Sequence, residues 1–429
     1  MRYYVVAFLI IAVFIVPSAL LNFPAQSHAF LSVMNSIGDR LTAAVGLAHN
    51  PVTIEQVKND YATATLAMAA GQAQPHKVRI LIVPGHEPTS GGAEGYGLKE
   101  RDMTVELAQD LIKYLKQNEH YEVFTTRDTN NWTPDFANYF KTQWEQIKTW
   151  TNAHVVETRS LQRVGEYAQV TPTVHHTKAA PDVALRLYGV NKWANENDID
   201  IALHIHFNDY PGHAASGGKY SGFTIYVPEK QYFNSTTSKA IAGAVFKRLA
   251  RYNPVSNLPG EDEGIVEEQD LIAIGAFNSV DAASMLTEYG YLYEQRFQDP
   301  DVRHRTLDEM AYETYLGLLD FFDPSVASSV SHLYDTQIMP YQWTKIITGS
   351  GSGDSSEDIF ALQTALILDG DYPPTGKTMN ECPRSGSFGP CTKLGLSKFQ
   401  AKYDISGEQN VVGPKTIEML NKIYGSRPQ

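Results

Sequence analysis

Apolar and polar positions along the chain follow two periods, which together predict an α/β fold. Residues 77–83 form an apolar run rich in β-branched residues that stops at Pro84-Gly85, a pattern typical of a buried strand. From 100 to 117, apolar residues recur every four positions and predict an amphipathic helix. Further strands are predicted at 122–126, 199–206, 222–227 and 284–288, and further helices at 54–68, 191–196 and 237–252. This alternation predicts a sheet covered on both faces, with ligand sites at strand ends.

The stretch 128–185 interrupts this alternation and reads as a helical insertion. Thr133-Pro134 predicts the start of a helix, and large apolar residues follow at helical spacing. They are Phe136, Phe140, Trp144 and Ile147. Two interpretations stay open. The helix either packs on the flank of the domain or forms a lid over the site, aided by His175 and His176.

The pattern changes again after residue 322. Residues 323–356 are expected to be a linker, because they end in a Gly/Ser-rich run from 349 to 356. Beyond the linker, 357–429 predicts a small helical domain. Two Gly-Pro pairs there precede Thr392 and Thr416, and we expect each threonine to cap the following helix.

The first 29 residues have the layout of an export segment. An uncharged apolar run follows Arg2, and small residues at 27 and 29 match a cleavage site. The segment is either a cleaved signal peptide or an uncleaved anchor that tethers the chain to a membrane. Residues 30–76, which follow it, are expected to be a connector. In both cases we expect an exported, extracytoplasmic protein. Cys382 and Cys391 are therefore expected to form a disulfide, because two thiolates cannot close a structural zinc shell.

The overall charge of the chain bears on the kind of partner that it can bind. The formal net charge of −13 argues against a nucleic-acid partner, since nothing would neutralise phosphates over a broad surface. The acidic run from 261 to 270 is expected to be a solvated loop, with a role near the cleft as the alternative.

Residues of the kind that bind zinc stand at the predicted strand ends. A zinc hydrolase needs three ligands from His, Glu or Asp, a coordination site for water, and a carboxylate that moves protons. The candidates are His86, Glu100, His204, His206 and Glu288. Each signal alone is weak, because a lone loop histidine is usually a surface residue and a glutamate at a helix start usually complements the helix dipole.

The order of the surrounding motifs is more specific. They are Val83-Pro84-Gly85-His86, Gly97-Leu98-Lys99-Glu100-Arg101-Asp102, Thr126-Arg127-Asp128, Ala194-Asn195, Ile205-His206-Phe207-Asn208 and Leu286-Thr287-Glu288-Tyr289-Gly290-Tyr291. Over about 78–322 the chain resembles the zinc-dependent N-acetylmuramoyl-L-alanine amidases, cell-wall hydrolases of the amidase type 3 family. The resemblance implies a catalytic domain at 77–322 whose mixed sheet is sandwiched between helices.

The resemblance also implies chemistry. His86, Glu100 and His206 would bind zinc (Zn2+), and Glu288 would be the catalytic carboxylate. The substrate would be peptidoglycan, cut between the lactyl group of N-acetylmuramic acid and L-alanine. Two alternatives stay open: a catalytically silent wall-binding or regulatory protein, and a zinc peptidase that cuts within the stem peptide. We expect a monomer.

Three departures from the family pattern are visible. Val83 stands where an acidic residue is usual, Glu87-Pro88 replaces two glycines, and His204 replaces a serine. His204 and His206 face the same side of a strand, so either could reach a metal. The strand-end position and the Asn208 that follows favour His206.

Three other residues are candidates for supporting a ligand or contacting substrate: His204, Asn208 and Arg127. His204 has a second interpretation as a buried core histidine. The C-terminal unit resembles a peptidoglycan-binding domain through mostly structural positions, namely Leu362-Gln363, Leu366, Gly386, Phe388-Gly389, Thr392, Phe399-Gln400, Gly413 and Thr416.

Overall fold

The structure is a computed structural model that describes residues 49–69, 77–174, 176, 178–210, 218–331, 336–349 and 356–426. The predicted export segment, His175 and the Gly/Ser residues 350–355 lie outside this range. Among the described residues, no helix is both long enough and apolar enough to cross a bilayer.

Six strands form one mixed sheet in the order β4-β1-β5-β8-β6-β7. Strands β4, β1, β5 and β8 are mutually parallel, whereas β6 pairs antiparallel with β8 and parallel with β7. In sheet order, the bounds are Tyr121–Thr125, Val78–Pro84, Ile201–Asn208, Ala283–Tyr291, Thr224–Pro228 and Ile265–Glu268. A separate two-stranded hairpin joins β2 (Glu94–Gly95) to β3 (Leu98–Lys99).

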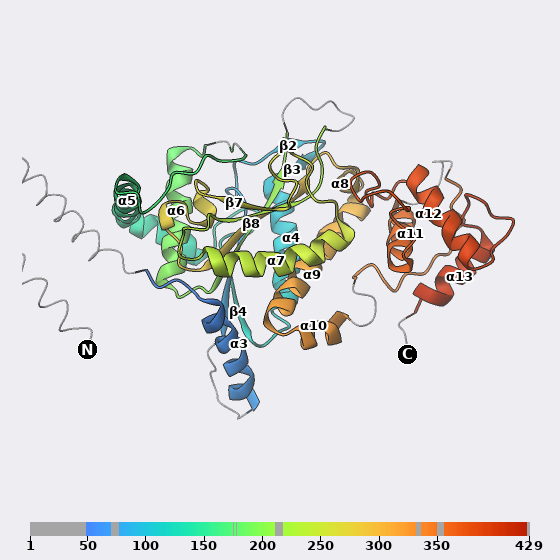
Figure 1. Ribbon diagram of the computed structural model, residues 1–429, viewed down its shortest axis with the longest axis horizontal. Helices are drawn as coiled ribbons and strands as arrows, with labels where there is room; N and C mark the ends of the chain where they lie inside the picture. Colours follow the sequence, from blue (N-terminus) through green and yellow to red (C-terminus); the bar gives the residue numbers. More distant parts are fainter. Residues whose placement is uncertain are drawn as a thin grey trace, which may run out of the picture.

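The period-two pattern of the strands divides the core into two layers. Ile80 and Ile82 of β1 pack with one group of helices, while Leu81 and Val83 pack with another. The first layer holds α3 (Ile54–Ala69), α4 (Glu100–Leu115), α7 (Ser235–Tyr252) and α9 (Pro300–Phe322). The second holds α5 (Pro134–Arg163), α6 (Pro181–Glu196) and two short 3-10 helices, η2 (Ile272–Ile274) and η3 (Ala276–Asn278). In Figure 1, α5 and α6 lie to one side of the labelled strands of this sheet and α9 to the other. The chain is thus a mixed α/β protein whose sheet lies between helices, as predicted.

The insertion helix α5 packs on the flank of this fold through α6. Phe136, Phe140 and Ile147 are buried in the second layer. The helices approach closely at Gly189, where an added Cβ would lie 2.9 Å from Ile147. After α5, the chain passes beside the site described below, because the ring of His176 lies 4.9 Å from that of Tyr226.

The C-terminal helical unit consists of α11 (Ser356–Asp369), α12 (Pro390–Lys402) and α13 (Pro414–Tyr424). A disulfide joins Cys382 to Cys391. The core of this unit also includes Ile338, Trp343 and Ile347, which precede the Gly/Ser run. Two short helices, α8 (Gln295–Gln298) and α10 (Pro324–Ser331), flank α9.

The predicted threonine caps are wrong. Gly389 and Gly413 are the N-cap residues of α12 and α13 and have no side chain that could cap. At the start of α13, the carboxylate of Glu408 accepts hydrogen bonds from the backbone amides of Lys415 and Thr416 at 2.9 Å each. Thr392 and Thr416 are buried instead and accept hydrogen bonds from the amides of Gln363 and Gln400 at 3.0 Å each. Burial of an amide needs a partner inside the unit, and each threonine hydroxyl supplies one.

The C-terminal unit docks on α9 through a buried charge pair. The guanidinium of Arg384 lies 3.7 Å from Glu309 and 5.1 Å from the ring centre of Tyr252 on α7. Glu309 also accepts a hydrogen bond of 2.6 Å from Thr336. At the edge of the contact, the Asn380 amide donates to the Val255 carbonyl at 2.8 Å. The two units therefore share a desolvated interface.

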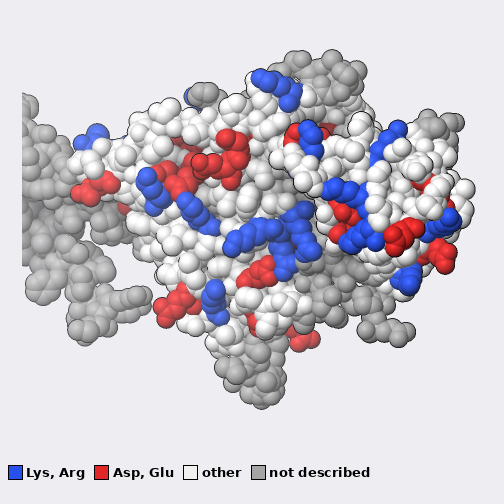
Figure 2. Space-filling model, turned by 45° about the vertical axis from the view of Figure 1, so that its right-hand side comes forward, with Lys and Arg blue, Asp and Glu red and all other residues white. Residues whose placement is uncertain are grey.

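Charges of both signs occur on the face shown in Figure 2, where Lys and Arg side chains form a band and acidic side chains form separate groups. This face presents no broad field of one sign.

Candidate active site

The loop after β1 presents His86 in a strained conformation. His86 has a φ of 65°, in the left-handed region that non-glycine residues rarely occupy. Two glycines leave room for the histidine rings that lie close to the backbone here. A Cβ on Gly85 would lie 2.5 Å from the His206 ring, and one on Gly92 (φ +83°) would lie 2.9 Å from the His86 ring. Other residues at these two positions would push the histidines apart.

Glu100 begins α4 and lies between the two histidines. Its Oε2 is 2.8 Å from His86 Nε2, and its Oε1 is 3.1 Å from His206 Nδ1. Backbone amides of Ala93 and Phe207 donate to the same carboxylate at 2.9 and 3.1 Å and fix its orientation. The three side chains place their donor atoms within 4.8 Å of one another.

This cluster fits a metal ion better than a closed set of hydrogen bonds. His86 Nε2 is buried and, although it is close to Glu100, it makes no hydrogen bond of normal geometry. Burial would raise the pKa of Glu100, but the hydrogen bond with His206 and the close approach of His86 outweigh burial and hold its pKa below the ordinary range. Burial lowers the pKa of His206, and it outweighs the hydrogen bond and the charge of Glu100, which act in the opposite direction. An anionic carboxylate between two histidines is a common zinc-ligand set.

Glu288 lies beside this cluster on the neighbouring strand. It pairs in register with His206 across β5 and β8, and with Thr224 across β8 and β6. Its Oε2 is buried and has no hydrogen-bond partner among the described residues. Burial raises the pKa of Glu288 well above its ordinary value, and the charges of Glu100 and Glu261 add to this shift. A carboxylate with a free oxygen beside a metal site is suited to proton transfer.

Glu261 is a residue of this site that the sequence did not reveal. The acidic run was expected to be a solvated loop, yet Glu261 is fully buried and Ile265–Glu268 forms strand β7. Glu261 accepts hydrogen bonds from the hydroxyls of Ser256 and Tyr226, the latter at 2.5 Å. The hydroxyls compensate the burial of the charge, which the solvated-loop interpretation did not anticipate. No local signal separates Glu261 from its acidic neighbours.

The remaining candidates occupy supporting positions. Arg127 is buried, and its guanidinium donates to the carbonyls of Pro84, Gly85 and Arg101, so it braces the backbone that carries His86 and Glu100. The Asn208 amide points to Glu261 at 3.4 Å.

His204 lies outside the three-residue cluster. It is one side-chain repeat back from His206 on the same face of β5, in register with Val83 and Leu286. Burial lowers its pKa to about 3, with a further contribution from His206, so the ring is neutral.

A family model described as N-acetylmuramoyl-L-alanine amidase matches residues 80–318, more than half of the chain. The chain belongs to the N-acetylmuramoyl-L-alanine amidase family. The match to this amidase family includes His86, Glu100, His206 and Glu288 and ends before the C-terminal helical unit. Comparison with curated proteins gives no significant match.

Several solved structures of amidases are similar to this chain. An N-acetylmuramoyl-L-alanine amidase from Clostridium difficile 630 is 17% identical, with a TM-score of 0.36, over 58% of this chain and 97% of that one. Ami1 from Mycobacterium smegmatis is 15% identical, with a TM-score of 0.38, over 58% and 97%. The catalytic domain of CwlV from Bacillus (Paenibacillus) polymyxa is 17% identical, with a TM-score of 0.34, over 58% and 97%.

Proposed function

We propose that this chain is an exported zinc-dependent amidase that cuts peptidoglycan between the lactyl group of N-acetylmuramic acid and L-alanine. One observation carries the proposal within the family: the donor atoms of His86, Glu100 and His206 lie within 4.8 Å of one another beside the free oxygen of Glu288. Three ligands and a neighbouring carboxylate are the parts that hydrolysis of an amide requires.

Each residue of the site has a separate task in this proposal. Zinc held by His86, Glu100 and His206 would supply a Lewis acid for the carbonyl and for the attacking water. Glu288 would accept the proton of that water at Oε2 and pass it to the leaving nitrogen of L-alanine. Glu261 would hold Tyr226 and Ser256 in place behind Glu288, and Arg127 would fix the loop that carries His86.

The C-terminal unit would bind the wall. We propose that it is a peptidoglycan-binding domain, supported by the resemblance of its turn and core positions, and that the chain acts as a monomer. Its disulfide suits an oxidising, extracytoplasmic location.

Mass spectrometry of digested peptidoglycan tests this function. We expect wild-type protein to release free stem peptides that begin with L-alanine, and Glu288→Gln protein to release almost none. Shorter peptide fragments would instead indicate a peptidase. No release by folded, zinc-loaded wild type would indicate a wall-binding protein without activity.

A further inference from the structure

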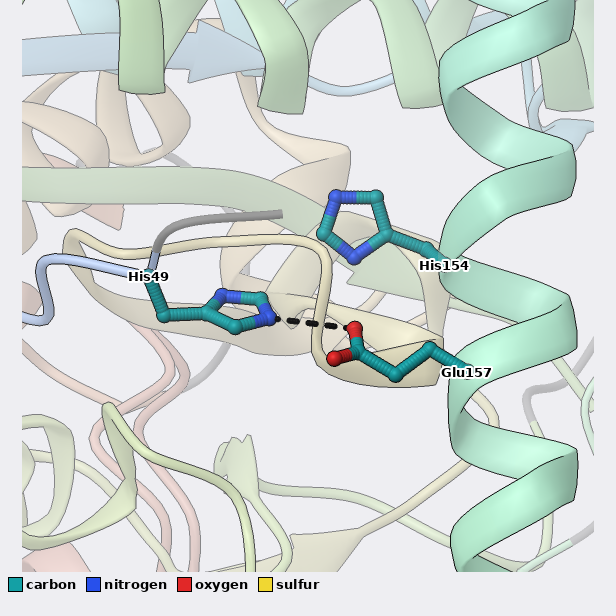
Figure 3. A group of neighbouring side chains, drawn as sticks. All are labelled: His49, His154 and Glu157. Atoms are coloured by element: carbon teal, nitrogen blue, oxygen red, sulfur yellow. Dashed lines mark hydrogen bonds and ion pairs between the residues drawn. The ribbon is translucent and has the colours of Figure 1, made fainter. Parts of the chain in front are cut away.

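A second group of metal-ligand side chains lies where the N-terminal segment meets the insertion helix. His154 and Glu157 project from one face of α5 toward His49, which precedes α3 (Figure 3). The three side chains place their donor atoms within 4.8 Å of one another, as the His86 cluster does. Residues three apart on a helix are neighbours, so α5 supplies two ligands from rigid backbone.

This group is distinct from the candidate active site. Asp281, which contacts His49, lies two residues before β8, whereas Glu288 lies near the other end of that strand. At about 3.3 Å per residue, the two sites are on the order of 20 Å apart, at opposite ends of the sheet. A hollow of about 300 Å3, lined by His49, His154, Asn195 and Asp281, gives an ion a path to the second group.

The two nitrogens of His49 have different neighbours. Nδ1 lies 3.2 Å from Asp281 Oδ1, and Nε2 lies 3.4 Å from Glu157 Oε2. A carboxylate on one ring nitrogen is the usual way to orient a histidine that binds metal through the other. Two ligands of a tetrahedral zinc with bonds of about 2.0–2.1 Å lie roughly 3.3 Å apart, close to the second distance.

His154 is the residue that a simple ion pair does not explain. In one interpretation, His49 is only a cation between Asp281 and Glu157, whose hydrogen bonds outweigh burial and raise its pKa to about 9. That interpretation does not explain why His154 is buried beside the ion pair. His154 is 2% exposed, and neither ring nitrogen makes a hydrogen bond of normal geometry, although the backbone of Phe277 and Asn278 lies beside the ring. An unpaired imidazole buried beside a carboxylate is costly unless it has a ligand.

We propose that His49, His154 and Glu157 form a second divalent transition-metal site, for zinc in particular, with Asp281 orienting His49. Two imidazoles and a carboxylate suit zinc rather than magnesium or calcium. The ion would tie the segment before α3 to the insertion helix. Its task would be structural, because the ion would join two segments that lie 108 positions apart in the chain.

Metal counting on full-length protein tests the proposal without reference to activity. After equilibration with zinc and removal of free metal, we expect two zinc ions per wild-type chain. The double variant His86→Ala/His206→Ala should keep one. Adding His154→Ala to the double variant should remove the remaining zinc. Adding His304→Ala instead, at an exposed histidine on α9, should leave that zinc in place. Cobalt substitution in the double variant should give the absorption of a tetrahedral cobalt site, which His154→Ala should abolish.

Two further variants guard against misfolding. Because His154 is buried, Glu157→Gln and His49→Ala should be measured too, with circular dichroism as the check on folding. Both should lower zinc affinity at least ~10-fold. The proposal would be overturned if the double variant held no zinc. It would also be overturned if none of the three substitutions changed zinc content or affinity. If the His86 cluster did not bind zinc, wild-type protein would hold one zinc ion, and His154→Ala would remove it.

Discussion

His206 on β5 and Glu288 on β8 are register partners on adjacent parallel strands, and a shift in register follows directly after them. Neighbouring strands lie about 4.8 Å apart, so backbone hydrogen bonds fix the spacing between the proposed metal ligand and the proposed catalytic carboxylate. The other two proposed ligands, His86 and Glu100, come from the loop and the helix that follow β1. The sheet thus holds half of the site in place.

Replacement of Glu288 by glutamine separates proton transfer from metal binding. Glu288→Gln is nearly isosteric and should leave one zinc at the first site, while turnover falls at least ~100-fold, the usual scale for a general acid or base. Metal analysis and rates on a soluble muropeptide measure the two effects. Loss of the first zinc would make Glu288 a ligand and contradict its proposed task.

Replacement of the two β5 histidines tests which one binds metal. His206→Ala should lose the zinc of the first site and all activity, because His206 lies 3.1 Å from Glu100. His204→Ala should keep that zinc and lose at most ~10–100-fold in rate, since His204 lies outside the cluster. The opposite result would mean that the motif has been placed two residues out of register.

The Arg384–Glu309 pair should dominate the interface between the two units. Arg384→Ala leaves the buried carboxylate of Glu309 without its cation, and should lower the free energy of unfolding by about 3–5 kcal/mol. Arg305→Ala breaks a partly exposed pair with Glu357 in the same interface and should cost about 0–1 kcal/mol. Urea unfolding of the full chain compares them, and equal losses would show that the buried pair does not hold the interface.

The pH dependence of stability should respond to Asp110 on α4. Burial and the charge of Asp308 raise its pKa to about 6, and its Oδ2 is buried without a hydrogen bond. The folded chain therefore binds this proton more tightly than the unfolded chain, and stability falls as pH rises from about 4 to 6. Asp110→Asn should stabilise the protein by on the order of 1 kcal/mol at pH 7.5, after a discount for solvent screening, and much less at pH 4.5. Melting temperatures at both pH values measure this, and an equal shift at both would contradict it.

Local patterns were sufficient for the elements that carry the site. The apolar run at 77–83 and the four-residue period from 100 predicted β1 and α4 to within two residues. Strand order was not predictable, because the antiparallel placement of β6 beside β8 depends on which faces pack in three dimensions.

Buried polar residues were the main failure of sequence reasoning. Glu261 and Glu268 stand in an acidic run that reads as solvated, and only the surrounding hydroxyl and backbone donors make their burial tolerable. His154 stands among aromatic residues of a long helix, and its partner His49 is more than a hundred positions away. In both cases the compensating groups come from distant segments, which no local period encodes.

The docked C-terminal unit limits how this protein can be recombined. Arg384 belongs to that unit, and Glu309 belongs to α9 of the amidase fold. Exchange of either unit for that of another protein would leave a buried charge without its partner, unless the partner residue were exchanged with it. The two units are therefore coadapted, and a working chimera would need residues 309 and 384 to be exchanged as a matched pair.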